Sequence, residues 1–270
     1  YTYVANQAAA DDLDAGDTAT DVFNYTLSDG TATDIATITI TVTGINDAPV
    51  AQNDVGVINE DATLTVSNSA NANVSGSYDA TGEHSGDVIN TSSSSHTDSD
   101  PDDSASLVVS AIRTGGTEGS GTAGSIGSAL TGTYGQLTIA ANGSYSYVAN
   151  QSAADDLDAG DSATDVFNYT LSDGTATDIG TITITVLGLN DPVVAVNDTG
   201  SVNEDATLTV SDGSGDIIAN NDTDADDSAS LVVSAIRLGG TEGSGTAGTV
   251  GSALTGTYGQ LTLNANGSYT

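Results

Sequence analysis

The chain has 270 residues and a formal net charge of −35, because 37 Asp and Glu residues are set against only 2 Lys and Arg. So few cationic side chains cannot neutralise a phosphate backbone, which excludes nucleic acid as a main ligand and argues equally against anionic lipid surfaces. The absence of Cys excludes disulfides and thiolate metal sites. No apolar run reaches the roughly 20 residues of a membrane span, so no membrane insertion is expected.

Internal repetition is the dominant feature of the sequence. Residues 1–50 recur at 145–194 with 42 of 50 positions identical, and residues 103–145 recur at 227–269 with 38 of 43 identical. The two offsets, 144 and 124 residues, differ by the length of an insertion, and such recurrence indicates an array of structural repeats. We expect residues 1–49 to be the C-terminal part of a preceding repeat and residues 195–270 the N-terminal part of a following one. Between them, residues 50–194 form a complete repeat with an insertion at about 67–97.

Taken in chain order, the apolar pattern predicts strands. Residues 23–27 and 38–42 alternate apolar and polar side chains with a period of two, which is typical of a strand with one buried face. Residues 64–66 repeat that pattern, and residues 107–109 indicate a more fully buried strand. Asn142 and Gly143 tolerate positive φ and lie between two short strand patterns, which predicts a hairpin.

The segments between the strands carry turn signals. Residues 8–21 are expected to be loop despite an alanine run, and the glycine-rich residues 115–132 a long flexible connection. Asp29-Gly30 and Asp173-Gly174 are expected to be hairpin turns. Six or more short strands in a unit of about 100–125 residues predict an all-β fold of tandem Greek-key sandwiches.

Acidic side chains recur at the spacing that oxygen-ligated cations favour. Ca²⁺ takes six to eight oxygen ligands, often from residues spaced by two. Two Asp-x-Asp-x-Asp runs have this spacing and are predicted calcium sites: Asp98, Asp100 and Asp102, and their counterparts Asp222, Asp224 and Asp226. A second predicted cluster unites Asn46, Asp47, Asp54, Glu60 and Asp61, and recurs as Asn190, Asp191, Asp198, Glu204 and Asp205. The alternative is that these side chains are turn formers bonded to local backbone.

Catalytic residues are not predicted. Both histidines lie in the polar insertion, so a His-based triad cannot recur from repeat to repeat. Arg113 and Arg237 occupy equivalent positions after a Val-Val-Ser-Ala-Ile strand, and each is expected to pair with a carboxylate at the strand end. The sequence therefore favours a binding or structural protein over an enzyme.

In this arrangement the chain resembles VCBS-type and cadherin-like tandem repeats of large bacterial surface adhesins. The matching segments are YGQLTIAANGSY at 134–145, FNYTLSDG at 23–30, ITITVTGIND at 38–47, NEDATLTV at 59–66 and NDTDADD at 221–227. The resemblance implies an Ig-like sandwich, type I export to the bacterial cell surface, service in adhesion or biofilm matrix, and Ca²⁺ at the junctions between repeats.

Two functional hypotheses follow. The first is a structural segment of an extracellular filament or giant adhesin, a rod or spacer that calcium stiffens. The alternative is an adhesin module that itself binds surface glycans or protein. Near-identity of the repeats favours the spacer, because a spacer needs no difference between its units. Its partners would be neighbouring identical repeats, either in one covalent chain or in subunits that complete each other's split domains by strand donation.

Overall fold

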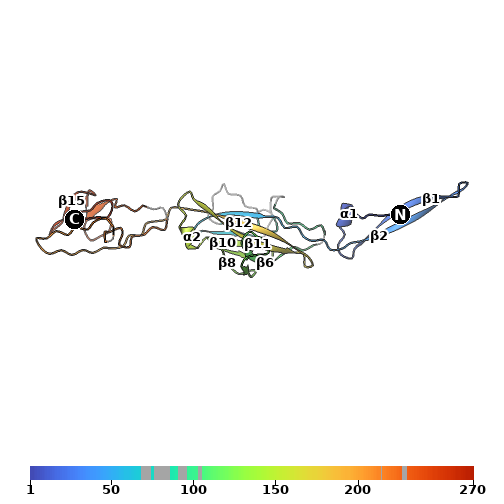
Figure 1. Ribbon diagram of the computed structural model, residues 1–270, viewed down its shortest axis with the longest axis horizontal. Helices are drawn as coiled ribbons and strands as arrows, with labels where there is room; N and C mark the ends of the chain where they lie inside the picture. Colours follow the sequence, from blue (N-terminus) through green and yellow to red (C-terminus); the bar gives the residue numbers. More distant parts are fainter. Residues whose placement is uncertain (68–73, 76–85, 91–95, 103–104, 214, 227–229) are drawn as a thin grey trace. The chain divides into compact units, whose positions relative to one another are not determined.

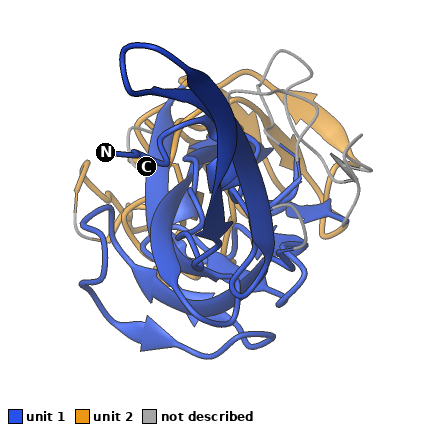
Figure 2. Ribbon diagram, turned by 90° about the vertical axis from the view of Figure 1, so that its right-hand side faces the viewer, with its two compact units in different colours: residues 1–154, 161–187 blue, residues 155–160, 188–270 orange. Residues whose placement is uncertain are grey.

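The computed structural model describes residues 1–67, 74–75, 86–90, 96–102, 105–213, 215–226 and 230–270. Most of the predicted insertion at 67–97 lies outside the described residues. The chain divides into two compact units, one of residues 1–154 and 161–187 and one of residues 155–160 and 188–270 (Figure 2). We call the second the C-terminal unit. No helix among the described residues is long and apolar enough to cross a membrane.

The first unit contains a two-sheet sandwich. One sheet has the order β3-β12-β11-β6-β7. Its strands are β3 (Asp54–Asn59), β6 (Val108–Thr114), β7 (Ala123–Gly124), β11 (Ser162–Ser172) and β12 (Thr177–Leu187). All neighbours in it are antiparallel except β3 and β12, which pair in parallel.

The other sheet has the order β5-β4-β10-β9-β8, with every pair antiparallel. Its strands are β4 (Thr63–Val66), β5 (Val74–Ser75), β8 (Leu130–Thr131), β9 (Gln136–Ile139) and β10 (Tyr145–Val148). β9 and β10 form the predicted hairpin across Asn142-Gly143. Several strands of the two sheets are labelled in Figure 1.

The core lies between the sheets and is built from alternate residues of each strand. Phe167, Tyr169 and Leu171 of β11 are fully buried, as are Ile182, Ile184 and Val186 of β12. Leu64, Leu137, Ile139 and Tyr147 supply the opposite face. This period-two burial confirms the predicted all-β sandwich.

Residues 1–49 hold a long antiparallel hairpin, β1 (Thr18–Ser28) with β2 (Thr33–Thr43), which we call the N-terminal hairpin. A one-turn helix, α1 (Ala8–Asp11), precedes it, and α2 (Ser152–Asp155) stands at the counterpart position before β11. The prediction of loop at residues 8–21 was therefore wrong over this turn, because the alanine run keeps enough helix propensity for four residues. It was also wrong over residues 18–21, which form the start of β1.

The C-terminal unit contains two short hairpins. β13 (Ile236–Leu238) pairs with β14 (Thr246–Gly248), and β15 (Ala253–Thr255) pairs with β16 (Gln260–Thr262). These strands are counterparts of the end of β6 and of β7, β8 and β9.

Two further predictions need correction. The connection predicted at 115–132 contains β7 and β8, which form the edges of the two sheets, so this segment crosses from one sheet to the other. Residues 107–109 are not uniformly buried: Val109 faces the core while Val108 is exposed, as expected when β6 has one face toward solvent.

Candidate cation site

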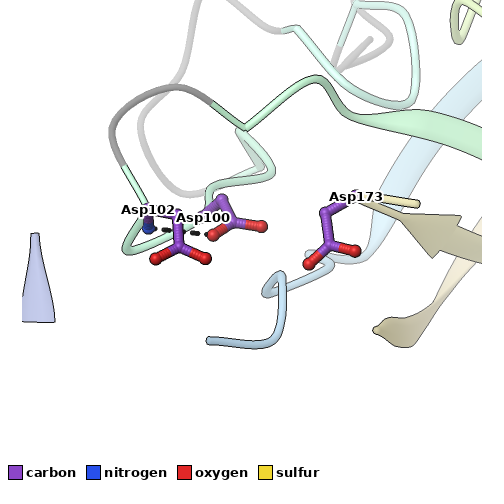
Figure 3. A group of neighbouring side chains, drawn as sticks. All are labelled: Asp100, Asp102 and Asp173. Carbon is purple, nitrogen blue, oxygen red and sulfur yellow. Dashed lines mark hydrogen bonds between the residues drawn. The ribbon is translucent and has the colours of Figure 1, made fainter. Parts of the chain in front are cut away.

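Three aspartates from two separate loops come together at one end of the sandwich. Asp100 and Asp102 lie in the loop before β6, and Asp173 lies in the turn between β11 and β12 (Figure 3). One carboxylate oxygen from each lies within 4.8 Å of the others, close enough for all three to bind one cation. We call these residues the aspartate cluster.

Local hydrogen bonds orient the carboxylates of Asp173 and Asp100. Asp173 Oδ1 accepts from the backbone N–H groups of Thr175 at 2.6 Å and Ala176 at 2.7 Å, as expected of a hairpin turn. Asp100 Oδ1 accepts from the N–H of Asp102 at 2.9 Å. These bonds engage one oxygen of Asp173 and one of Asp100, and they leave the second oxygen of each for other contacts.

The linker that precedes β3 is bonded directly to the aspartate cluster. Asn46 Nδ2 donates to Asp173 Oδ2 at 2.9 Å, and the backbone N–H of Asp47 donates to Asp102 Oδ2 at 3.0 Å. Residues that follow the N-terminal hairpin are thus tied to the loop end of the sandwich.

The cluster contains oxygen atoms that lack a partner. Asp102 is only 7 % exposed, and its Oδ1 is buried without a hydrogen bond, as is Oδ2 of Asp100. Burial raises the pKa of Asp100, and the charges of Asp102, Asp173 and Asp47 raise it further, despite an opposing hydrogen bond from the Asp102 N–H. Buried carboxylate oxygens without partners are costly unless a cation or a proton neutralises them.

Neither arginine supplies that cation within the described part of the chain. Arg113 donates to the carbonyl of Gly121 at 3.3 Å, and Arg237 to the carbonyl of Gly245 at 3.5 Å. The prediction that each arginine pairs with a carboxylate was wrong, because the guanidinium closes the neighbouring loop instead. The donor set of the cluster consists of hard oxygens, which suits Ca²⁺.

Parallel pairing explains why these segments meet. β3 runs in the same direction as β12, with Asp54 paired to Ile182 and Asn59 to Leu187. The linker enters β3 at the end where β12 begins, and β12 begins directly after the turn that contains Asp173. The topology therefore brings the turn and the linker together.

Asp98, predicted to converge with Asp100 and Asp102, lies in a different contact. Its neighbour Ser99 forms a bridge with Val50, and the Asp98 carboxylate faces β11. Asp98 Oδ1 accepts from the N–H of Gln52 at 2.7 Å, and both its oxygens lie 3.2–3.3 Å from the hydroxyl of Tyr169. That hydroxyl also contacts Asp54 Oδ2 at 3.0 Å.

This inner cluster, Asp54 and Asp98 around Tyr169, is almost completely buried. Burial raises the pKa of Asp98 to about 7, opposed by its hydrogen bonds from Gln52 and Tyr169. Burial and the neighbouring carboxylates also raise the pKa of the Tyr169 hydroxyl. The Tyr169 hydroxyl thus lies between the two carboxylates of this inner cluster.

Glu60 and Asp61 lie apart from the residues with which they were grouped. They follow the end of β3, whereas Asp54 begins that strand, about 20 Å away for six extended residues. The N–H of Glu60 donates to the carbonyl of Leu187, and Asp61 has a positive φ of 55°. The structure therefore separates the predicted linker cluster into three places: Asn46 and Asp47 at the aspartate cluster, Asp54 at Tyr169, and Glu60-Asp61 at the far end.

In the C-terminal unit, part of the same geometry recurs. The N–H of Asp191 donates to Asp226 Oδ2 at 3.0 Å, and the N–H of Asp226 donates to Asp224 Oδ1 at 3.1 Å. Asp226 Oδ1 is again buried without a partner. The other predicted residues have these contacts: Asn190 donates to the carbonyl of Asp191, Asp198 accepts from Asn220, Asp222 accepts from the N–H of Val196, and Glu204 and Asp205 are exposed.

The family model for the bacterial cadherin-like domain matches residues 46–188, just over half of the chain. The chain belongs to this family. The matched range begins at the linker residue Asn46 and ends after β12, so the cadherin-like domain includes the sandwich and every residue of the aspartate cluster. Domains of this family are typically extracellular or surface-associated, are generally non-catalytic, and often bind Ca²⁺.

Comparison with curated proteins gives no match. Among solved structures, similarity is found to the endo-fucoidan hydrolase MfFcnA4 from glycoside hydrolase family 107, at 18 % identity and a TM-score of 0.25. A variant of the same hydrolase matches at 12 % identity and the same TM-score. The matches cover 66 % and 63 % of this chain but only 19 % of the hydrolase chain in each case.

Sequence reasoning did not identify Asp173 as a site residue of the cadherin-like domain. Asp173-Gly174 was interpreted as a hairpin turn, which is correct. Asp173 Oδ1 closes that turn, and its Oδ2 accepts from Asn46 at the aspartate cluster. Asp173 could have been identified only from knowledge that β3 pairs in parallel with β12, and that pairing leaves no local signal in the sequence.

Proposed function

We propose that the chain is a structural segment of an extracellular bacterial filament or giant adhesin, in which Ca²⁺ at each linker stiffens the array of cadherin-like domains. In this role the protein is a spacer on the cell surface and not an enzyme. VCBS-type adhesins are the context that its repeats favour.

One observation carries the proposal. The aspartate cluster combines a buried, unpartnered carboxylate oxygen on Asp102 with direct hydrogen bonds to linker residues Asn46 and Asp47. A cation held there would neutralise three carboxylates and bind the loop end of the sandwich to the chain that enters it. Calcium binding would therefore restrict the linker as well as stabilise the domain.

The proposal is tested by melting the chain with excess Ca²⁺ and with excess EGTA, together with calcium titration calorimetry. Calcium present at about 100 times its dissociation constant should add about 2.7 kcal/mol to the stability of the sandwich. Asp102→Asn should abolish most of that gain, because it removes the buried charge at the centre of the cluster.

Glu118→Gln is the matched control, since Glu118 is an exposed acid of the same sandwich outside the cluster. It should keep the full response to calcium. An equal calcium response in Asp102→Asn and Glu118→Gln, or no response in the unmodified chain, would contradict the proposal.

A further inference from the structure

The N-terminal hairpin exposes an apolar face that its counterpart buries. β1 and β2 pair in the same register as β11 and β12, residue for residue. Phe23 and Tyr25 are nevertheless 49 % and 50 % exposed, whereas Phe167 and Tyr169 are completely buried. A contiguous exposed apolar face of this kind indicates an interaction surface.

In the C-terminal unit, most of the residues that such a hairpin would pair with are not in strands. In the sandwich, β3 pairs with β12 and β6 pairs with β11. The counterparts of β3 and of most of β6 are residues 198–203 and 232–235, and neither segment forms a strand within the described unit. By contrast, β14, β15 and β16 are present, and their counterparts do not pair with β11 or β12.

The C-terminal unit also has a groove where the apolar face would pack. Its lining includes Val202, Leu208, Leu261 and Tyr269. Their counterparts in the sandwich, Ile58, Leu64, Leu137 and Tyr145, are all buried core residues. The groove therefore presents the half of a core that the hairpin lacks.

A polar contact supports the same fit. In the sandwich, Asp165 accepts from the backbone N–H groups of Thr133, Tyr134 and Gly135 at 2.8–3.1 Å, and from the Tyr147 hydroxyl at 2.6 Å. The hairpin retains the last of these contacts, because Tyr3 donates to Asp21 at 2.5 Å.

The amides that would complete this contact lie in the C-terminal unit. They belong to Thr257, Tyr258 and Gly259, and Tyr258 is fully exposed. Asp21 and these three amides are thus two separated parts of one recurring contact.

We propose that the N-terminal hairpin of one chain docks into the C-terminal unit of a second copy of this chain, where β1 pairs with residues 232–238 and β2 with residues 198–203. The hairpin and the C-terminal unit then form one sandwich together, and repetition of the contact builds a head-to-tail polymer. This interaction goes beyond the spacer role, and its strand pairing requires no calcium.

Docking would also complete a second aspartate cluster. Asp29 is the counterpart of Asp173, and its Oδ1 accepts from the N–H groups of Thr31 and Ala32 in the same way. In the polymer, Asp29 of the docked hairpin would join Asp224 and Asp226 of the second copy. This last step rests on the proposed calcium site, whereas the docking does not.

Disulfide trapping tests the proposal, because the natural chain has no Cys. Thr183 and Val55 are register partners in the parallel pair of β12 with β3, and their counterparts are Thr39 and Thr199. The double variant Thr39→Cys with Thr199→Cys, oxidised in EGTA, should give a ladder of dimers, trimers and larger species on a non-reducing gel. Reductant should collapse the ladder to monomer.

The matched control for the cross-link is Thr41→Cys with Thr199→Cys. The expected partner of Thr41 is Ser201, so this pair is displaced by two residues, about 6.6 Å, and should not cross-link. An absent ladder from the Thr39 and Thr199 pair, a product of monomer size only, or an equal ladder from the displaced pair would overturn the proposal.

A second pair of variants tests whether the apolar face drives the trapping. Phe23→Asp in the trapped variant should abolish the ladder, because it places a charge where the counterpart Phe167 is completely buried. Thr20→Asp should keep the ladder, because its counterpart Thr164 stays exposed in the complete sandwich. Equal ladders from these two variants would overturn the proposal as well.

Discussion

The N-terminal hairpin and the β11–β12 hairpin have nearly the same sequence but different surroundings. In β11, Phe167 and Tyr169 are completely buried by the second sheet and by β3 and β6, whereas Phe23 and Tyr25 on β1 are about half exposed. Both hairpins keep the same register over eleven residue pairs. The strand pairing is therefore encoded locally, while burial depends on the strands that cover the hairpin.

The two faces of the N-terminal hairpin differ in whether their counterparts in the sandwich are buried. Ile38 is the register partner of Phe23, and its counterpart Ile182 is completely buried, so both side chains belong to the face that packs in a complete sandwich. Thr20 lies on the opposite face and pairs with Thr41. A charge on the first face should therefore prevent docking, and a charge on the second should not.

The largest expected effect comes from truncating the same aromatic residue in each hairpin. Phe167→Ala should destabilise the sandwich by about 3–5 kcal/mol, because it removes a fully buried ring and leaves a cavity. Phe23→Ala should leave the melting of the sandwich almost unchanged in monomeric chain. Chemical denaturation of both variants checks this, and similar losses of stability in the two would contradict the expectation.

A smaller effect is expected where the hairpins differ by one methyl group. A Cβ at Gly180 would lie 2.7 Å from the ring of Tyr169, so Gly180→Ala should cost about 1–3 kcal/mol in thermal melts. The counterpart residue is Ala36, which pairs with Tyr25. Ala36→Gly should leave the sandwich unchanged but increase trapping between chains, because it makes room for Tyr25 to adopt the buried position. Reduced trapping would contradict this explanation.

The smallest expected effect is a pH dependence at the inner cluster. The folded-state pKa of Asp98, about 7, lies above its ordinary value of 3.8. Protonated Asp98 is therefore favoured in the folded state. The stability that this protonation provides is present below about pH 4 and is lost as the pH rises through 7. Asp98→Asn should remove this slope, a difference of about 1–2 kcal/mol after solvent screening. Melting in EGTA from pH 4 to pH 8 checks it, and identical slopes in both proteins would contradict it.

Much of the fold could be predicted from sequence because its signals are local. The alternation over residues 38–42 correctly predicts the strand β2, although the apolar side chains at these positions are only half-buried, and Asn142-Gly143 predicts the β9–β10 hairpin. The spacing of Asp100 and Asp102 likewise identified two residues that meet in the structure. Each of these patterns depends on residues that are close in the sequence, so the structure it encodes could be predicted from the sequence alone.

The rest of the site depends on contacts between distant segments. Asp173 reaches the cluster because β3 and β12 pair in parallel, and Asp98 leaves the cluster because Tyr169, 71 residues later, accommodates it. The same reason explains why Phe23 could be assigned to a buried face but its exposure could not be foreseen. A period-two pattern indicates which face is apolar and not whether another element covers it.

Calcium stiffening of the linker is the central claim, and a distance measurement tests it most directly. Spin labels on cysteines introduced at Thr39 and Thr183 would report the distance between the N-terminal hairpin and the sandwich by pulsed electron paramagnetic resonance, with Phe23→Asp included to prevent docking between chains. We predict a narrow distance distribution in Ca²⁺ that broadens in EGTA, and a broad one under both conditions in Asp102→Asn. The same width with and without calcium in the chain that retains Asp102 would contradict it.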